Sequence, residues 1–257
     1  MIDRLAALVG AVPPFLMLWY AERFERRVRE PHVAWRYRVL AATGLAAVPI
    51  AWIERAVSLV IADVAEPQRS LSEAFLLAAT VEEAGKLTCL YVLTRSSLAP
   101  RTRYGSFLYA LHAATGFAIV ENVMMMLDTP DLVTFTVRLV LRGYLASPMH
   151  LLAGGIVGYV WARRRFDNGA IGLPGGLGLA IVIHGSYNAF LLGVERLPST
   201  QLHAVAVCAV AAIILPLGGI VLLRALATRL RADDERDGRP WRVVPTYAVP
   251  AVRSGGD

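Results

Sequence analysis

The chain has 257 residues, of which 56% are hydrophobic, and its mean hydropathy of +0.51 excludes an ordinary water-soluble domain. Its formal net charge of +6 comes from arginines that flank apolar stretches, so we expect the lipid bilayer as its surroundings and no nucleic-acid partner. The two cysteines, Cys89 and Cys208, lie in apolar stretches and indicate no disulfide framework.

Seven apolar stretches have roughly the 20-residue length that a helix needs to cross a bilayer. In chain order they cover residues 4–20, 39–60, 74–94, 105–127, 137–162, 174–194 and 203–226. The sequence therefore predicts an all-α fold, a polytopic transmembrane helix bundle of about seven spans within residues 1–228. Residues 229–257 are polar and carry Gly, Pro and mixed charge, a composition that predicts a flexible cytoplasmic tail.

The loops predict how this bundle is oriented. Arginines gather in alternate loops, with Arg163–Arg165 as the densest run, whereas the loops between them are mostly acidic or neutral, as at Asp128 and Asp131. Cytoplasmic loops are enriched in arginine, so we expect the N-terminus outside and the C-terminus inside. The expected location is the cell membrane, as a multi-pass protein.

Several predicted spans contain polar side chains that lipid would penalise. These polar residues are Glu82, Glu83, Lys86, Glu121, Asn122, Arg142, His150, His184 and Asn188. A charge at mid-bilayer costs about 2.5–3.5 kcal/mol on insertion scales, so such groups face the bundle interior and either pair or serve a function. Counted along the predicted helices, the glutamates, histidines and Asn188 lie between the midplane and the outer leaflet. Glu54 and Arg55, near an outer helix end, are expected to have an interfacial structural role.

Helical spacing suggests how the acidic motif is arranged. Glu82 and Lys86 are four residues apart with the glutamate first, the favourable order for an ion pair, whereas Glu83 points about 100° away. Lys86 is the only lysine among the 26 Lys and Arg residues. We expect it to hold Glu82 ionised and to leave Glu83 free to act on water.

The remaining polar residues share helix faces in the same way. His184 and Asn188 are four residues apart, as are Phe117 and Glu121. Carboxylates that act as a base, imidazoles that orient or ligate, and an amide that donates to developing negative charge together can activate water against a carbonyl. A proton-coupled transporter also places Glu, Lys and His in mid-membrane, although the chain shows no inverted repeat.

These residues lie in motifs that resemble those of a known family. EEAGK at 82–86 resembles the EExxK motif of the PrsW family of intramembrane proteases, and GFAIVEN at 116–122 resembles its FxxxEN motif. His150, in RGYLASPMHLLAGGIVGY, is similar to the family's histidine helix, and HGSYN at 184–188 to its last motif. The resemblance covers about residues 40–200, and its four motifs follow in order on successive spans.

The resemblance implies a membrane-embedded peptidase of the site-1 type, whose relatives cleave membrane-anchored proteins such as anti-sigma factors. It implies that Glu82 or Glu83 is the general base and that His150 and His184 orient the water or bind a metal. Asn188 stands where many relatives have Asp, which favours an oxyanion donor over a charged ligand.

The wider group also includes CAAX prenyl proteases and bacteriocin-immunity proteins. Glu121 takes the place of a histidine in the CAAX relatives, as a ligand or a second base. A non-catalytic membrane scaffold or immunity-type protein is therefore an alternative. The implied metal ligands, which suit zinc, are Glu83, Glu121, His150 and His184. Glutamates alone can also activate water, so the metal requirement stays open. The implied supporting residues are Lys86, Phe117, Asn122 and Arg142.

Overall fold

The structure, a computed structural model, describes residues 5–23, 33–95 and 100–238. Within these ranges every regular element is a helix, which confirms the all-α prediction. The elements in chain order are η1 (Ala6–Ala11), α1 (Val12–Arg23), α2 (Val33–Val60), α3 (Gln68–Leu71), η2 (Ser72–Ala79), α4 (Thr80–Thr94), α5 (Arg103–Leu127), α6 (Leu132–Leu141), η3 (Arg142–Ala146), α7 (Ser147–Asp167), α8 (Leu173–Arg196), η4 (Ser199–Gln201) and α9 (Leu202–Arg236).

Among the described residues, 5 helical stretches are long and apolar enough to cross a membrane. They are Ala34–Val60, Arg103–Leu127, Leu132–Asp167, Leu173–Arg196 and Ser199–Arg236. The other two predicted spans fall short for different reasons. The first is divided between the 3-10 segment η1 and α1, which has 12 residues, and the apolar part of α3, η2 and α4 contains Glu82, Glu83 and Lys86. Charge, rather than length, therefore separates the motif-bearing helix from the five spans.

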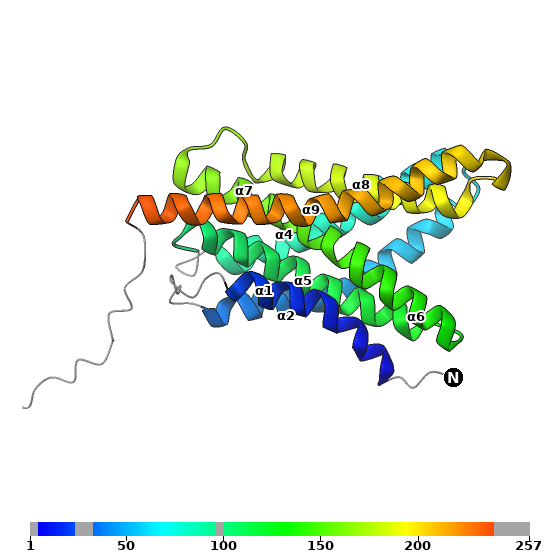
Figure 1. Cartoon of the computed structure of the whole chain (residues 1–257), viewed down its shortest axis with the longest axis horizontal. Helices are drawn as coiled ribbons and strands as arrows, with labels where there is room; N and C mark the ends of the chain where they lie inside the picture. Colours follow the sequence, from blue (N-terminus) through cyan, green and yellow to red (C-terminus); the bar gives the residue numbers. More distant parts are fainter. Residues whose placement is uncertain (1–4, 24–32, 96–99, 239–257) are drawn as a thin grey trace, which may run out of the picture.

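Helix α5 forms the centre of the bundle, packed between α2 and α7, and the long helices run side by side (Figure 1). Gly116 explains how closely α2 approaches, since a Cβ atom there would collide with the carbonyl oxygen of Leu40. Gly158 of α7 meets Phe107 of α5 in a similar way. Small residues at helix contacts allow the close backbone packing that holds membrane helices together.

An ionic network fastens α5, α7 and α9 at the end of the bundle where α9 ends. The Asp234 carboxylate accepts hydrogen bonds from the backbone N–H groups of Arg103 at 3.0 Å and Tyr104 at 2.9 Å, and so caps α5. Arg103 also pairs with Asp167, and Arg163 pairs with Asp233 at 2.6 Å. The assignment of this arginine-rich end to the cytoplasm stays a prediction.

The end of α9 also bears on the predicted tail. Residues 229–236 belong to α9, and Asp234 is buried. The remainder of the predicted tail, residues 239–257, lies outside the described residues.

Two π-helical segments precede the helices that carry the acidic motif and His150. Segment η2 leads into α4 and segment η3 leads into α7. Directly after each segment, a hydroxyl donates to the carbonyl five residues earlier: Thr80 to Phe75 at 2.7 Å and Ser147 to Arg142 at 2.9 Å. Such wide turns shift the register of a helix and are frequent at functional sites.

Candidate active site

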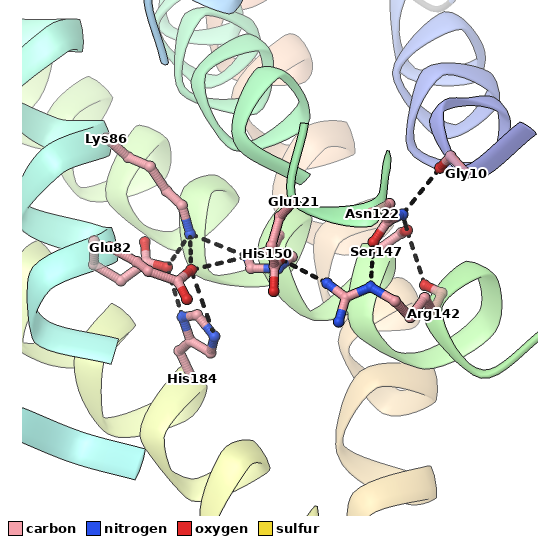
Figure 2. A network of polar contacts seen from close by, with 10 residues as sticks. Gly10, Glu82, Lys86, Glu121, Asn122, Arg142, Ser147, His150 and His184 are labelled. Carbon is pink, nitrogen blue, oxygen red and sulfur yellow. Dashed lines mark hydrogen bonds and ion pairs between the residues drawn. The ribbon is translucent and has the colours of Figure 1, made fainter. Parts of the chain in front are cut away.

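Three helices bring five ionisable side chains together inside the bundle (Figure 2). Helix α4 contributes Glu82, Glu83 and Lys86, α7 contributes His150, and α8 contributes His184. All five are no more than 4% exposed, so they interact with one another with little competition from surrounding solvent. The ionisable residues that the sequence singled out on these three helices therefore form one cluster.

Gly185 explains how η2 and α8 come close enough to form this cluster. A Cβ atom at Gly185 would collide with the ring of Phe75, which lies on η2. The glycine follows His184 directly, so the contact holds this part of α8 against the segment that leads into the acidic motif. A larger residue would push the two elements apart and His184 away from the glutamates.

Lys86 lies among the acidic and imidazole groups. Its ammonium donates to Glu83 Oε1 at 2.7 Å and to Glu82 Oε2 at 3.2 Å, and it lies 3.0 Å from His150 Nδ1. The predicted pairing with Glu82 is therefore confirmed, but the prediction that Glu83 stays free of Lys86 is wrong. Residues three apart on a helix are neighbours as well as those four apart, and here the three-residue contact is the shorter.

Glu83 also orients His184. Its Oε1 atom lies 2.8 Å from His184 Nδ1. An ionised carboxylate only accepts hydrogen bonds, so Nδ1 carries the hydrogen and Nε2 keeps its lone pair. That Nε2 lies 4.0 Å from Glu82 Oε2. The imidazole therefore presents its free nitrogen to the same space as Glu82.

Glu121 of α5 orients His150 in the corresponding way. Its Oε2 atom lies 2.7 Å from His150 Nε2, so this nitrogen carries the hydrogen and Nδ1 keeps its lone pair. His150 Nδ1 lies 3.8 Å from Glu82 Oε2. The same Glu121 oxygen lies 2.7 Å from Arg142 Nη2. Each imidazole is thus hydrogen-bonded to a carboxylate through the ring nitrogen that faces away from Glu82, as is common for histidines that ligate a metal.

A chain of polar contacts extends from Arg142 to the N-terminal segment (Figure 2). The Arg142 Nε–H donates to Asn122 Oδ1 at 2.7 Å. The Asn122 amide donates to Ser147 Oγ at 3.0 Å and to the Gly10 carbonyl at 3.1 Å. Arg142 therefore has its position fixed by three elements: α5, the start of α7 and η1.

Two residues implied by the resemblance lie at the edge of the cluster. Phe117 packs beside it, with its ring centroid 4.2 Å from Lys86 Nζ and 5.8 Å from the His150 ring. Asn188 lies one helical turn after His184 and is half-buried, and its side chain makes no hydrogen bond with the described residues. Its amide is available to a bound molecule.

Glu54 of α2 also faces this region, although the sequence suggested an interfacial structural role. It lies on the same helix face as Ala47 and Ile50, which pack against Phe117 of α5. Its Oε1 atom is buried without a hydrogen-bond partner among the described residues, and it interacts electrostatically with Glu121. The seven-residue spacing from Ala47 was the signal that could have identified it.

The cluster has donors that fit a metal ion. Glu82, Glu83, His150 and His184 each offer one ligand atom, and these atoms lie within 4.8 Å of one another. Imidazole nitrogen with carboxylate oxygen is a donor set that zinc accepts, and the carboxylates behind both imidazoles match the usual outer partners. Glu121, which the resemblance suggested as a ligand, lies outside this group and contacts His150 instead.

A helical membrane protein with paired carboxylates and oriented imidazoles buried among its helices has the groups for hydrolysis within the membrane, which defines the class of intramembrane peptidases. Residues 31–215 match the model of the PrsW family of intramembrane metalloproteases. The match covers more than half of the chain, so the chain belongs to this family, and the resemblance seen in its four motifs is confirmed. Neither a curated protein nor a solved structure is significantly similar to it.

Proposed function

We propose that this peptidase is a multi-pass enzyme of the cell membrane that hydrolyses a peptide bond of a membrane-anchored protein, such as an anti-sigma factor. The observation that carries this proposal is the buried group of Glu82, Glu83, His150 and His184, whose ligand atoms lie within 4.8 Å. Membership of a protease family supports a protein as the substrate. A substrate anchored in the bilayer can reach a site enclosed by membrane helices.

Glu82 is the general base in this proposal. Its Oε2 atom accepts one hydrogen bond, from Lys86, and faces the free nitrogens of both imidazoles at 3.8 and 4.0 Å. The corresponding oxygen of Glu83 is occupied twice, by Lys86 and by His184. Glu82 is therefore better placed to take a proton from attacking water and to pass it to the leaving amine.

The other groups position the reactants. Glu83 and Glu121 each hold one imidazole, and Arg142 holds Glu121. Asn188 donates its amide to the oxygen that becomes negative when the carbonyl is attacked, a role consistent with its unused hydrogen-bonding groups. Lys86 balances the charge of the two adjacent glutamates.

We propose zinc as the ion and the free nitrogens of His150 and His184 as its ligands, with Glu83 orienting His184 and Glu82 left as the base. Bound there, zinc would supply Lewis acidity to the peptide carbonyl. Lys86 lies 3.0 Å from His150 Nδ1, so its ammonium has to move away from this nitrogen when the ion binds. Two cations cannot occupy the same donor atoms.

The test is cleavage in cells. The full chain is expressed with single-span anti-sigma factors and, separately, with a generic tagged single-span substrate, and fragments are followed by immunoblotting. Glu82→Gln is expected to abolish cleavage at unchanged protein level. Glu195→Gln, an exposed glutamate on α8, serves as the matched control and is expected to cleave normally.

Each result decides a different part of the proposal. Equal cleavage by Glu82→Gln and the intact protein would remove Glu82 as the base. Cleavage of the generic substrate without cleavage of any anti-sigma factor would refute the narrower substrate assignment. Cleavage of neither substrate would contradict the proposed hydrolysis of membrane-anchored proteins.

A further inference from the structure

The first two elements of the bundle, η1 and α1, lie outside the region that matches the family. That match begins at residue 31, whereas η1 and α1 cover Ala6–Ala11 and Val12–Arg23. Both elements pack against α5, and α1 runs beside it in Figure 1. The helix that carries Glu121 and Asn122 therefore has a neighbour from outside the matched region.

Gly10 is the point at which η1 meets the polar chain of the site (Figure 2). Its carbonyl accepts a hydrogen bond from the side-chain amide of Asn122 at 3.1 Å. Gly10 is buried, and a Cβ atom there would lie 3.2 Å from backbone atoms of Asn122 and 3.1 Å from the Met126 side chain. These separations are tighter than ordinary van der Waals contact, so glycine allows the backbone of η1 to come close enough to α5 for this hydrogen bond.

Both side-chain amide hydrogens of Asn122 are used, one by the Gly10 carbonyl and the other by Ser147 Oγ at 3.0 Å. A carbonyl oxygen only accepts hydrogen bonds, so the contact with Gly10 fixes which end of the amide carries the nitrogen. The other end, Oδ1, is thereby turned to Arg142 Nε at 2.7 Å. Asn122 is 1% exposed, so water is poorly placed to replace a lost partner.

Arg142 of η3 extends this constraint to the cluster. Its Nε–H group donates to Asn122, and its Nη2 atom lies 2.7 Å from Glu121 Oε2. The guanidinium is planar and rigid, so its contacts with these two neighbouring residues of α5 are set together. The same Glu121 oxygen lies 2.7 Å from His150 Nε2. A shift of Asn122 therefore displaces the carboxylate that orients His150.

The opposite end of α1 is attached to the bundle by side chains of α5. The Glu22 carboxylate lies 3.0 Å from His112 Nε2, and the Tyr104 hydroxyl donates to the Ala21 carbonyl at 2.8 Å. Glu22 follows Gly10 by twelve residues, or roughly 18 Å along the helix. The element is thus attached to α5 at both ends, which determines how far along α5 Gly10 lies.

We propose that η1 and α1 are a positioning element for the peptidase: the Gly10 carbonyl fixes Asn122, and the contacts that continue from Asn122 orient His150. The element acts on the cluster of the proposed function, on which this inference rests. It adds to that cluster a part of the chain that precedes the matched region. Gly10 touches neither substrate nor metal and acts through Arg142.

His184 serves as an internal reference for His150. It is oriented by Glu83 of α4 and not by Glu121 of α5. A change at Gly10 should therefore disturb His150 and leave His184 as it is. General loosening of the bundle would disturb both imidazoles.

Nitrogen-15 NMR of selectively labelled histidine measures this orientation on the full chain, purified in detergent with a chelator. Gly10→Val adds a branched side chain where a Cβ atom alone is already close to α5. We expect the ring-nitrogen signals of His150 to shift and those of His184 to stay, each assigned from a His→Gln variant. Leu8→Val is the matched control, since Leu8 is exposed on the same segment, and it is expected to leave both signals unchanged.

A milder variant guards against misfolding of Gly10→Val. Gly10→Ala requires the neighbours to move by only a few tenths of an ångström. It is expected to shift the His150 signals in the same direction by a smaller amount and again to leave those of His184 in place.

Kinetics with the tagged single-span substrate distinguish positioning from general destabilisation. Gly10→Val is expected to lower kcat about tenfold with KM nearly unchanged, as for other partners behind a metal ligand. In an Arg142→Gln background the same change should lower kcat by less than about twofold, because the contacts through Arg142 are already lost. Leu8→Val is expected to cleave as the intact protein does.

Each outcome decides the inference. Unchanged His150 signals or an unchanged kcat in Gly10→Val would overturn it. Equal shifts of both histidines, or a tenfold loss of kcat that recurs in the Arg142→Gln background, would also overturn it, because a loosened bundle explains either result. Absence of cleavage by the intact protein would instead contradict the proposed function, and the NMR comparison would still decide whether η1 orients His150.

Discussion

Replacing Lys86 by methionine tests the electrostatics of the site directly, because the two side chains are similar in length and only lysine carries charge. The ammonium contacts two buried carboxylates at 2.7 and 3.2 Å, and lies over the Phe117 ring at 4.2 Å. At an effective dielectric constant of about 20, each unit charge pair near 3 Å is worth roughly 5 kcal/mol before desolvation. Removing one partner from a buried pair has a measured cost of about 3–5 kcal/mol.

We therefore expect Lys86→Met to lose about 3–5 kcal/mol of stability in the absence of metal. For a chain of this size that corresponds to a lower melting temperature by on the order of 10 °C. Lys86→Arg is the control for charge. It keeps the cation but adds volume to a buried site, for which overpacking costs about 1–3 kcal/mol, so we expect it to retain the fold and part of the activity.

The same variant reports on metal binding. Lys86 contacts Glu82, Glu83 and His150, which are three of the four potential ligands, so its ammonium and a divalent ion compete for the same atoms. Zinc is expected to raise the melting temperature of Lys86→Met more than that of the intact protein. Free ligand at one hundred times its Kd stabilises by about 2.7 kcal/mol.

The assay is thermal unfolding in one detergent, with a chelator and then with zinc added. If Lys86→Met and the intact protein have the same melting temperature in chelator, Lys86 does not balance the charge of the glutamates. Equal stabilisation of both proteins by zinc would instead refute the competition for ligand atoms. If Lys86→Arg is as inactive as Lys86→Met, lysine has a role in hydrolysis beyond its charge.

Three further predictions concern groups around the site and the bundle. Arg142→Gln is expected to lower kcat about ten- to hundredfold with little change in KM, because Glu121 loses the guanidinium that fixes it; an unchanged kcat would exclude this positioning role. Cysteines placed singly at 164 and at 128 are expected to be labelled by an impermeant maleimide in intact cells only at 128, and the opposite result would invert the topology. Asp131→Ala is expected to speed amide exchange at the start of α6 at pH 7. Hydrogen bonds from the Thr134 backbone N–H and hydroxyl hold the pKa of Asp131 below its ordinary value. The hydrogen bonds to Asp131 are therefore fully effective above about pH 4 and are lost as pH falls through the lowered pKa. An unchanged exchange rate in Asp131→Ala at pH 7 would exclude Asp131 as the helix cap.

The sequence predicted which side chains form the buried cluster because lipid makes polar groups rare inside the membrane. Glu82, Glu83, His150 and His184 stood out as charges or imidazoles in apolar spans, and the structure brings them together. Depth along each predicted helix was sufficient to place them at a common level. No knowledge of the contacts between helices was needed for that step.

The pairing of these groups across helices could not be predicted in the same way. It depends on how each helix is rotated about its axis, and the π-helical segments before α4 and α7 change that rotation by inserting a residue into a turn. The contact of Asn122 with the Gly10 carbonyl also joins residues 112 positions apart, and no periodic pattern encodes it. The surroundings of Glu54 could not be predicted for a related reason, since they depend on which face of α2 meets α5.

The position of Glu82 follows from the carboxylates behind the two imidazoles. Glu121 accepts a hydrogen bond from His150 Nε2, and Glu83 accepts one from His184 Nδ1, so each ring turns its free nitrogen toward Glu82. Loss of one outer carboxylate should misdirect one imidazole and leave the other in place. Loss of Glu82 should leave both rings oriented and remove the proposed general base. Variants that lack one orienting carboxylate, Glu83 or Glu121, should therefore still bind metal, although more weakly. Glu82→Gln should bind metal but fail to hydrolyse substrate.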